Sequence, residues 1–212
     1  MRLFLDTAIV SDVEERLPTG LISGITTNPT LIKKSGRDPE DVYRELFNLG
    51  VMDLSIEVPG TDCTEFIANG FQAVRDWGSY ATVKLPCTVE GLKACKYLEE
   101  RNVRCNMTLV FSVSQAVLCG IARATYVSPF VGRVDDNGLD GLKLVKDICE
   151  VYCRQDIATK VLAASIRDAQ SAAKAFSSGA YICTLPPKVF DNMSTHVLTD
   201  KGLEQFNRDF LA

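Results

Sequence analysis

An uninterrupted alternation of strand-like and helix-like segments is the feature that most limits how this sequence can fold. Eight short apolar segments are each followed by a segment in which apolar residues recur at helical spacing. The strand-like segments are Leu3–Thr7, Ile22–Thr27, Asp53–Val58, Ala81–Pro86, Val103–Thr108, Tyr126–Val131, Lys160–Ser165 and Tyr181–Leu185. Because parallel neighbouring strands need a crossover connection, strands that alternate with helices predict a parallel sheet.

Eight such units on short connections predict one closed (β/α)8 barrel, a TIM barrel, covering residues 1–212. Between the sixth strand and a crossover helix at Leu139–Arg154 we expect a turn rich in Asp and Gly. An extra C-terminal helix is expected at about residues 202–211. A doubly wound open sheet is the alternative, but no glycine-rich dinucleotide turn follows the first strand.

Charge and hydropathy limit the partners. The chain has 23 Lys and Arg against 27 Asp and Glu, a net charge of −4, and no basic run dense enough to follow a phosphate backbone. We therefore expect no nucleic-acid partner. The N-terminus reaches Asp6 too soon for the apolar core of a signal peptide, and no apolar run is long enough to span a bilayer. These features predict a cytoplasmic protein with no membrane partner.

Eight cysteines raise the alternatives of disulfides or a metal site, and their spacing supports neither. The sequence contains no C-x-x-C pair. Cys149 and Cys153 lie one helical turn apart, but no second pair follows at zinc-finger distance. We expect reduced cysteines that serve as small hydrophobic residues, and no metal site.

Lys84 lies near the end of the fourth strand-like segment, where it would project into the barrel. A buried cation is costly unless it is paired or loses its proton. Lys84 is therefore either half of a buried ion pair, with Glu57 on the adjacent strand as the partner, or an amine adapted for nucleophilic chemistry.

Polar side chains recur at the ends of the predicted strands. They are Asp6, Asn28, Glu57, Lys84, Asn106, Thr108, Ser128, Ser165 and Thr184. In such barrels the C-terminal strand ends meet on one face and carry the reactive groups. A structural barrel could bury one or two of these side chains, but the whole set predicts an active site.

Imine formation is the chemistry that suits these residue types. A free lysine amine has a pKa of about 10.4, and desolvation or a nearby cation lowers it enough for attack on a carbonyl. The resulting carbinolamine must lose water, for which Glu57 and Thr108 could supply a proton donor and a positioned water. Asp6 could accept a hydroxyl proton when a carbon–carbon bond breaks.

Two segments predict a phosphate site. Ser165 and Arg167 follow the seventh strand, a common phosphate position in these barrels, and Phe130–Arg133 follows the sixth. Two guanidinium groups and a hydroxyl would clamp an anion. Either arginine alone could instead be a surface ion-pair partner.

Seven segments resemble the successive signatures of the transaldolase family, in family order. They are Leu5–Thr7, Thr26–Pro29, Ile56–Val58, Val83–Pro86, Asn106–Ser112, Ser128–Arg133 and Ala164–Arg167. Any one of these segments is a weak signal, but seven in order are highly specific. The short length resembles the small subfamily that also contains fructose-6-phosphate aldolase.

The resemblance implies a class I aldolase barrel with no metal and no organic cofactor. It implies that Lys84 forms a Schiff base with a ketose, that Asp6 is the general base of retro-aldol cleavage, and that Glu57 with Thr108 handles the catalytic water. The substrate-binding residues that it implies are Asn28, Asn106 and Ser128 for the dihydroxyacetone hydroxyls, Phe130 beside them, and Arg133, Ser165 and Arg167 for the phosphate.

Two positions separate the activities within that resemblance. The aldolase typically carries glutamine at the position of Glu57 and tyrosine at that of Phe130, so both residues resemble the transaldolase pattern. The implied reaction transfers a dihydroxyacetone unit from sedoheptulose 7-phosphate to glyceraldehyde 3-phosphate, giving erythrose 4-phosphate and fructose 6-phosphate in the pentose phosphate pathway. The alternatives are a fructose-6-phosphate aldolase that releases free dihydroxyacetone, and a catalytically silent barrel that binds sugar phosphates.

The resemblance also implies a homo-oligomer, a pentamer or a decamer, in which the C-terminal helix packs on a neighbouring subunit. Leu203, Phe206, Phe210 and Leu211 would suit a docking helix. Docking on the chain's own barrel fits the sequence equally well.

Overall fold

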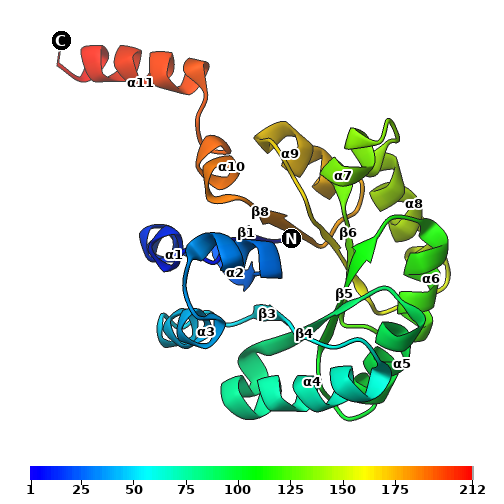
Figure 1. Ribbon diagram of the computed structural model, residues 1–212. Coiled ribbons are helices and arrows are strands. Elements are labelled where there is room, and N and C mark those ends of the chain that lie inside the picture. The colour runs from blue at the N-terminus through cyan, green and yellow to red at the C-terminus, as the bar shows by residue number, and fades with distance from the viewer. Residues whose placement is uncertain (212) are drawn as a thin grey trace.

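The computed structural model describes residues 1–211, and within them eight parallel strands close into a barrel in sequence order (Figure 1). The strands are β1 (Arg2–Asp6), β2 (Ile22–Thr26), β3 (Leu54–Glu57), β4 (Ala81–Pro86), β5 (Cys105–Val110), β6 (Tyr126–Pro129), β7 (Lys160–Ala163) and β8 (Ile182–Leu185). Closure between β8 and β1 confirms the (β/α)8 prediction over the open sheet. All strands run the same way, so their C-terminal ends meet on one face.

Helices surround this sheet and connect its strands. They are α1 (Val10–Arg16), α2 (Pro29–Ser35), α3 (Pro39–Asn48), α4 (Cys63–Trp77), α5 (Val89–Glu99), α6 (Val113–Ile121), α7 (Val131–Asp136), α8 (Gly141–Arg154), α9 (Ala169–Ser177), α10 (Pro187–Asn192) and α11 (Val197–Phe210), with 3-10 turns η1 (Leu17–Thr19) and η2 (Gly78–Tyr80). Polar caps begin several of them. Asp62, Thr88 and Ser112 each accept a hydrogen bond from a backbone N–H in the first turn of the helix that follows.

A small apolar cluster of Phe4, Leu162, Ile182 and Tyr126 fills the inside of the barrel. The Phe4 ring needs Gly24 beside it, because a Cβ at that position would lie 2.6 Å from the ring. Two larger clusters pack the outer face of the sheet against the helices. The inner apolar layer supports the polar strand ends above it.

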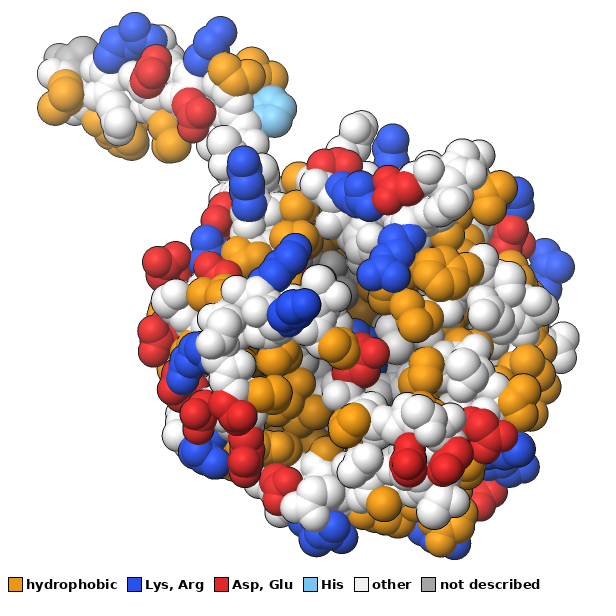
Figure 2. All heavy atoms as spheres, in the orientation of Figure 1, with side chains coloured by type: hydrophobic (Ala, Val, Ile, Leu, Met, Phe, Trp, Pro, Cys, Tyr) orange, Lys and Arg blue, Asp and Glu red, His pale blue; other side chains and the backbone are white. Residues whose placement is uncertain are grey.

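A buried carboxylate closes the opposite end of the barrel. Asp53 is 1% exposed and accepts hydrogen bonds from the Tyr126 hydroxyl at 2.6 Å and the Thr82 hydroxyl at 2.8 Å. Arg104 bonds the same carboxylate at 3.0 Å, and Arg2 lies 3.5 Å from it. A buried charge with this many partners is satisfied, so this end has a structural role. The hollow of the barrel opens on the other face (Figure 2).

Two elements differ from the sequence-based expectation. The sixth strand ends at Pro129, and the segment predicted as a turn contains the helix α7, which carries Arg133. The amides of Val131 and Gly132 bond to the carbonyls of Ala164 and Ser165, which turns the chain from β6 into this helix. The C-terminal helix begins at Val197 instead of near residue 202.

The earlier start of α11 is explained by His196, whose Nδ1 accepts a hydrogen bond from the Leu198 amide at 3.1 Å. Histidine is a less usual cap than Asp, Asn, Ser or Thr, so this signal is weak in the sequence. The helix projects away from the barrel (Figures 1 and 2), and none of its residues Val197–Phe210 is buried. Leu203, Phe206 and Phe210 are 54%, 62% and 86% exposed.

The eight cysteines, all within the described residues, are free thiols, as predicted. No helix in residues 1–211 is both long and apolar enough to cross a bilayer.

Candidate active site

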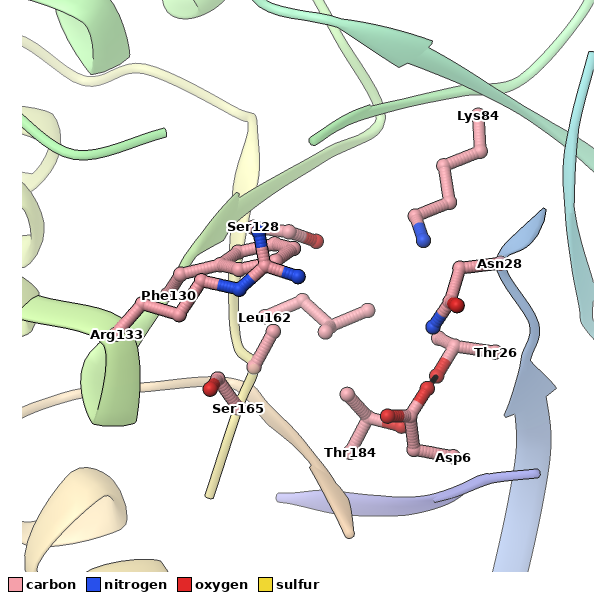
Figure 3. A pocket seen from close by; sticks show the side chains of 11 residues that line it. Asp6, Thr26, Asn28, Lys84, Ser128, Phe130, Arg133, Leu162, Ser165 and Thr184 are labelled. Carbon is pink, nitrogen blue, oxygen red and sulfur yellow. Dashed lines mark hydrogen bonds between the residues drawn. The ribbon is translucent and has the colours of Figure 1, made fainter. Parts of the chain in front are cut away.

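A pit at the C-terminal end of the barrel gathers most of the polar residues that the sequence analysis singled out. Its lining is Asp6, Thr26, Asn28, Lys84, Ser128, Phe130, Arg133, Leu162, Ala164, Ser165 and Thr184 (Figure 3). The pit encloses a cavity of about 90 Å3 below an open mouth. Lys and Arg side chains lie along part of its rim (Figure 2).

Lys84 is 5% exposed, and its Nζ lies within the pit (Figure 3). The amine donates a hydrogen bond to the Thr27 carbonyl at 2.9 Å and lies 3.2 Å from Glu57 Oε2. Glu57 and Lys84 are directly paired across β3 and β4, which explains the contact. The ion pair expected under the structural alternative is therefore present. The Lys84 amine also lines the open pit, where a substrate could reach it, and the Glu57 carboxylate is close enough to accept its proton.

Asp6 lies across the pit from the Phe130 and Arg133 side chains (Figure 3). Its Oδ1 accepts a hydrogen bond from the Thr26 hydroxyl at 2.7 Å. Burial raises the pKa of Asp6 above its usual range, and the Thr26 hydrogen bond and the charges of Lys84 and Arg133 oppose that rise. A carboxyl with a raised pKa is a better proton acceptor and suits general-base work.

A chain of polar side chains continues from the pit into β5 and β3. The Ser128 hydroxyl donates to Asn106 Oδ1 at 2.6 Å, and Asn106 Nδ2 donates to the Ser55 hydroxyl at 3.2 Å. Nearby on β5, the Thr108 hydroxyl is buried and has no hydrogen-bond partner within residues 1–211. The next residue, Leu109, has φ +58°, a strained conformation for leucine. An unpartnered buried hydroxyl beside a strained residue suggests a position arranged for a water or ligand.

The predicted phosphate clamp is divided between the pit and the surface. Arg133 lines the pit, with its guanidinium 4.8 Å from the centre of the Phe130 ring. Ser165 also lines the pit and has φ +59°. Arg167 does not line it and instead forms an ion pair with Asp136 on α7. Of the two arginines predicted for the clamp, Arg133 thus lines the pit, whereas Arg167 would have to leave Asp136 to reach an anion there.

The structure brings together most of the residues expected to bind and react. Some line the pit, and others lie behind it in contact with a lining residue or on the same strand. Asp6, Asn28, Lys84, Ser128, Phe130, Arg133 and Ser165 line the pit directly. Glu57 touches the Lys84 amine, Asn106 touches Ser128, and Thr108 lies on the same strand as Asn106.

Two residues of the pit, Thr26 and Thr184, received no individual catalytic or binding role in the sequence-based prediction. Thr26 is two residues before Asn28, and Thr184 is one of the strand-end polar residues. Their places at the last position of β2 and the second-to-last position of β8 are the signal that could have found them. Leu162 and Ala164 in the pit wall carry no such signal.

Metal-type ligands come together elsewhere in the described residues. The Cys95 and Cys105 thiols and the Glu99 carboxylate lie within 4.8 Å of one another. Glu99 Oε1 already accepts hydrogen bonds from the Cys105 amide at 2.8 Å and the Thr125 amide at 2.6 Å. These hydrogen bonds give the Glu99 carboxylate a structural role, because they hold the backbone where β5 and β6 begin.

The pit contains an amine, a carboxylate with a raised pKa and an arginine, and a second carboxylate, that of Glu57, contacts the amine. An amine and an adjacent acid–base group are what imine formation requires. A separate general base could then break a carbon–carbon bond in the bound imine. An arginine at the opposite wall would bind an anionic end of the substrate.

The sequence is similar along its whole length to known proteins. The family model described as Transaldolase/Fructose-6-phosphate aldolase matches residues 3–212. A probable transaldolase of Symbiobacterium thermophilum is 45% identical over 212 residues, 100% of this chain and 98% of that protein. A probable transaldolase of Lactiplantibacillus plantarum is 44% identical over 100% of this chain and 97% of its own length. One from Paracoccus denitrificans is 44% identical over 99% and 96%.

Proposed function

The chain belongs to the transaldolase/fructose-6-phosphate aldolase family, and from that premise we propose that it is a transaldolase. The proposed reaction transfers a dihydroxyacetone unit from sedoheptulose 7-phosphate to glyceraldehyde 3-phosphate, as in the pentose phosphate pathway. Its products are erythrose 4-phosphate and fructose 6-phosphate. The observation that carries the proposal is the Lys84 amine inside the pit with Glu57 in contact and Asp6 nearby.

Imine formation begins at Lys84. Its Nζ attacks the C2 carbonyl of the ketose after giving up a proton, and Glu57 Oε2 at 3.2 Å is the group placed to accept that proton. The carbinolamine then loses its hydroxyl as water. In this proposal Glu57 donates the required proton and the unpartnered Thr108 hydroxyl holds the water.

Carbon–carbon cleavage is assigned to Asp6. The carboxylate removes the proton of the C4 hydroxyl, the C3–C4 bond breaks, and its electron pair moves into the imine to form an enamine. The aldehyde product leaves, and the enamine attacks the acceptor aldehyde while Asp6 returns the proton. Burial raises the pKa of Asp6, which makes its carboxylate a stronger base for the cleavage step.

Binding is assigned to the remaining polar residues. Asn28, Asn106 and Ser128 are proposed to hold the dihydroxyacetone hydroxyls, with Phe130 forming part of the wall. Arg133 and Ser165 are proposed to bind the phosphate, joined by Arg167 once it exchanges Asp136 for the substrate. No metal or organic cofactor has a part in this scheme.

The alternative activity in this family is fructose-6-phosphate aldolase, which ends by hydrolysing the same intermediate and releasing dihydroxyacetone. Glu57 and Phe130 favour transfer, because the aldolase typically carries glutamine and tyrosine there. Turnover of fructose 6-phosphate with and without erythrose 4-phosphate tests the choice. Turnover that depends on the acceptor supports a transaldolase, turnover without it supports the aldolase, and binding without turnover would indicate a silent sugar-phosphate barrel.

We further propose that the protein works in the cytoplasm as a homo-oligomer, a pentamer or a decamer. The free thiols suit a reducing compartment. For the oligomer, the support is α11, whose apolar residues Leu203, Phe206 and Phe210 share one face and are exposed. Covering that face with a second copy would remove this apolar surface from water.

A further inference from the structure

Two threonine hydroxyls form a chain that ends on the Asp6 carboxylate. Thr26 Oγ1 lies 2.7 Å from Asp6 Oδ1 and 2.6 Å from Thr184 Oγ1 (Figure 3). Both threonines are 3% exposed and line the pit. They come from β2 and β8, the two strands that flank β1 and therefore Asp6. Buried polar groups are stable only when they are hydrogen-bonded, so each of these two short contacts should contain a hydrogen that one hydroxyl donates.

The hydrogens in this chain can be arranged in one way when Asp6 is ionised. A carboxylate accepts hydrogen bonds and donates none, so Thr26 must give its single hydroxyl hydrogen to Asp6 Oδ1. Thr184 must then donate to the Thr26 oxygen. Within residues 1–211, Asp6 Oδ2 has no hydrogen-bond partner. The chain therefore holds one carboxylate oxygen and leaves the other free toward the pit.

We propose that Thr26, and Thr184 acting through Thr26, are positioning residues that orient the Asp6 carboxylate for proton transfer. The inference rests on the proposed function, in which Asp6 takes the C4 hydroxyl proton. Thr26 holds Oδ1 and so limits rotation of the carboxylate, while Oδ2 receives the proton as the C3–C4 bond breaks. Thr184 holds the rotation of the Thr26 hydroxyl, so that its hydrogen points at Asp6.

Within residues 1–211, the Thr26 hydroxyl is the only side-chain group that donates a hydrogen bond to the Asp6 carboxylate. The charged groups that act on Asp6 are Lys84 from β4 and Arg133 from α7, and both act through charge without a hydrogen bond. Asp12 on α1 accepts instead from Thr7 at 2.9 Å, and Asp191 on α10 is held by Arg16. Point charges favour ionisation but do not fix direction, whereas a hydrogen bond does both.

The test uses borohydride, which reduces the imine on Lys84 to a stable amine, with fructose 6-phosphate as the donor. Mass spectrometry then separates an adduct of the intact ketose from an adduct of dihydroxyacetone, the form left after cleavage. Thr26→Val should raise the ratio of intact to cleaved adduct roughly 10- to 100-fold, the cost of losing a hydrogen bond to a charged group. Thr184→Val should raise it about 3- to 10-fold, because that bond is between neutral groups.

A second readout is the acidic limb of the pH–rate profile. The Thr26 hydrogen bond favours the ionised form of Asp6, so its loss should raise the pKa of Asp6 and move this limb to higher pH. The shift should be larger in Thr26→Val than in Thr184→Val. Thr26→Ser and Thr184→Ser keep the hydroxyls and should restore both readouts. The matched control is Thr82→Val, which removes a buried hydroxyl bonded to Asp53 at the closed end of the barrel and should leave the adduct ratio unchanged.

The outcomes separate the two proposals. No adduct on Lys84 of the unaltered protein would overturn the proposed function and this inference together. A normal adduct in the unaltered protein, with unchanged ratios and pH limbs in both valine variants, would overturn this inference alone. A change in Thr26→Val but none in Thr184→Val would remove Thr184 from it. The ratio is measured on molecules that already carry the imine, so a variant that folds in reduced yield still gives a result.

Discussion

Lys84 and Glu57 are directly paired across β4 and β3, with Nζ 3.2 Å from Oε2, at the edge of an open pit. The sequence left two possibilities for Lys84, a buried ion pair and a nucleophilic amine. The observed pair is compatible with both, because the carboxylate of an ion pair can take the proton of the ammonium during a reaction. A neighbouring carboxylate stabilises the ammonium and accepts its proton when a carbonyl arrives. The proposed chemistry therefore starts from the pair and not from the lysine alone.

Replacing the carboxylate of this pair should slow imine formation. Glu57→Gln keeps the size of the side chain and removes the proton acceptor, so we expect adduct formation at Lys84 to slow roughly 10²- to 10⁴-fold. Rapid-quench borohydride trapping with fructose 6-phosphate measures that rate. Glu90→Gln, at the half-exposed start of α5, is the matched control. An unchanged rate in Glu57→Gln would remove Glu57 from the proton transfer.

The raised pKa of Asp6 predicts how activity and stability depend on pH. Cleavage needs the ionised carboxylate, so activity should fall as the pH is lowered. Because burial raises the pKa of Asp6, this fall should occur at a higher pH than the pKa of an ordinary aspartate. The folded state holds this proton more tightly than the unfolded chain, so the favourable contribution of Asp6 to stability is present at low pH and is lost as pH rises through the raised pKa.

At neutral pH, Asp6→Asn should accordingly raise the melting temperature, abolish cleavage and still allow trapping of the intact ketose on Lys84. Calorimetry and mass spectrometry measure the two effects. A variant that melts lower than the unaltered protein at pH 7 and higher at acidic pH would show that folding lowers the pKa of Asp6 instead of raising it.

The unpartnered hydroxyl of Thr108 predicts a separation of stability from activity. Thr108→Val replaces a buried hydroxyl without a partner in residues 1–211, so stability should stay equal or rise by about 1 kcal/mol while imine formation slows. Thr82→Val, which loses a 2.8 Å hydrogen bond to Asp53, should destabilise the fold by about 1–3 kcal/mol. Denaturant unfolding compares the two. An equal loss of stability would show that Thr108 is structurally satisfied.

The two arginines should contribute unequally to phosphate binding. Arg133 already lines the pit, so Arg133→Gln should raise KM for fructose 6-phosphate roughly 10- to 100-fold. Arg167→Gln should have a smaller effect, because Arg167 must first break its ion pair with Asp136. Unphosphorylated fructose is the matched substrate. If KM for fructose rises as much as KM for its phosphate, Arg133 has another role.

The exposed face of α11 should hold copies of the chain together. Phe206→Glu places a charge on the apolar face, and sedimentation should then show a smaller species than the unaltered protein. Gln205→Glu adds the same charge one residue earlier and should leave the assembly unchanged. A Phe206→Glu variant that sediments like the unaltered protein would exclude α11 from the interface.

Much of this architecture is readable from the chain, because each βα unit has its own local pattern of apolar residues. Parallel pairing follows from the alternation, and Lys84 meets Glu57 because each is the fourth residue of its strand and the two adjacent strands pair from their first residues. Contacts that depend on side-chain choice are different. Arg167 has the same spacing after β7 whether it bonds a ligand or Asp136, and the sequence does not distinguish the two.

The hydrogen-bonded chain from Thr184 through Thr26 to Asp6 cannot be predicted from the sequence for a related reason. In the sequence Thr26 looks like any other strand residue. Its contact with Thr184 depends on closure of the barrel, which places β2 and β8 on either side of β1. The helix α7 is hard to predict because Pro129 and the following residues to Val131 resemble a continuing strand. In each case a contact between segments distant in sequence decides the outcome.

The most direct test of the proposed chemistry is borohydride reduction of the unaltered protein with fructose 6-phosphate, followed by peptide mass mapping. We predict a dihydroxyacetone-derived mass on Lys84, loss of that mass in Lys84→Ala, and loss of acceptor-dependent turnover with it. An unmodified Lys84 in the unaltered protein, together with normal turnover in Lys84→Ala, would contradict a Schiff-base mechanism at this residue.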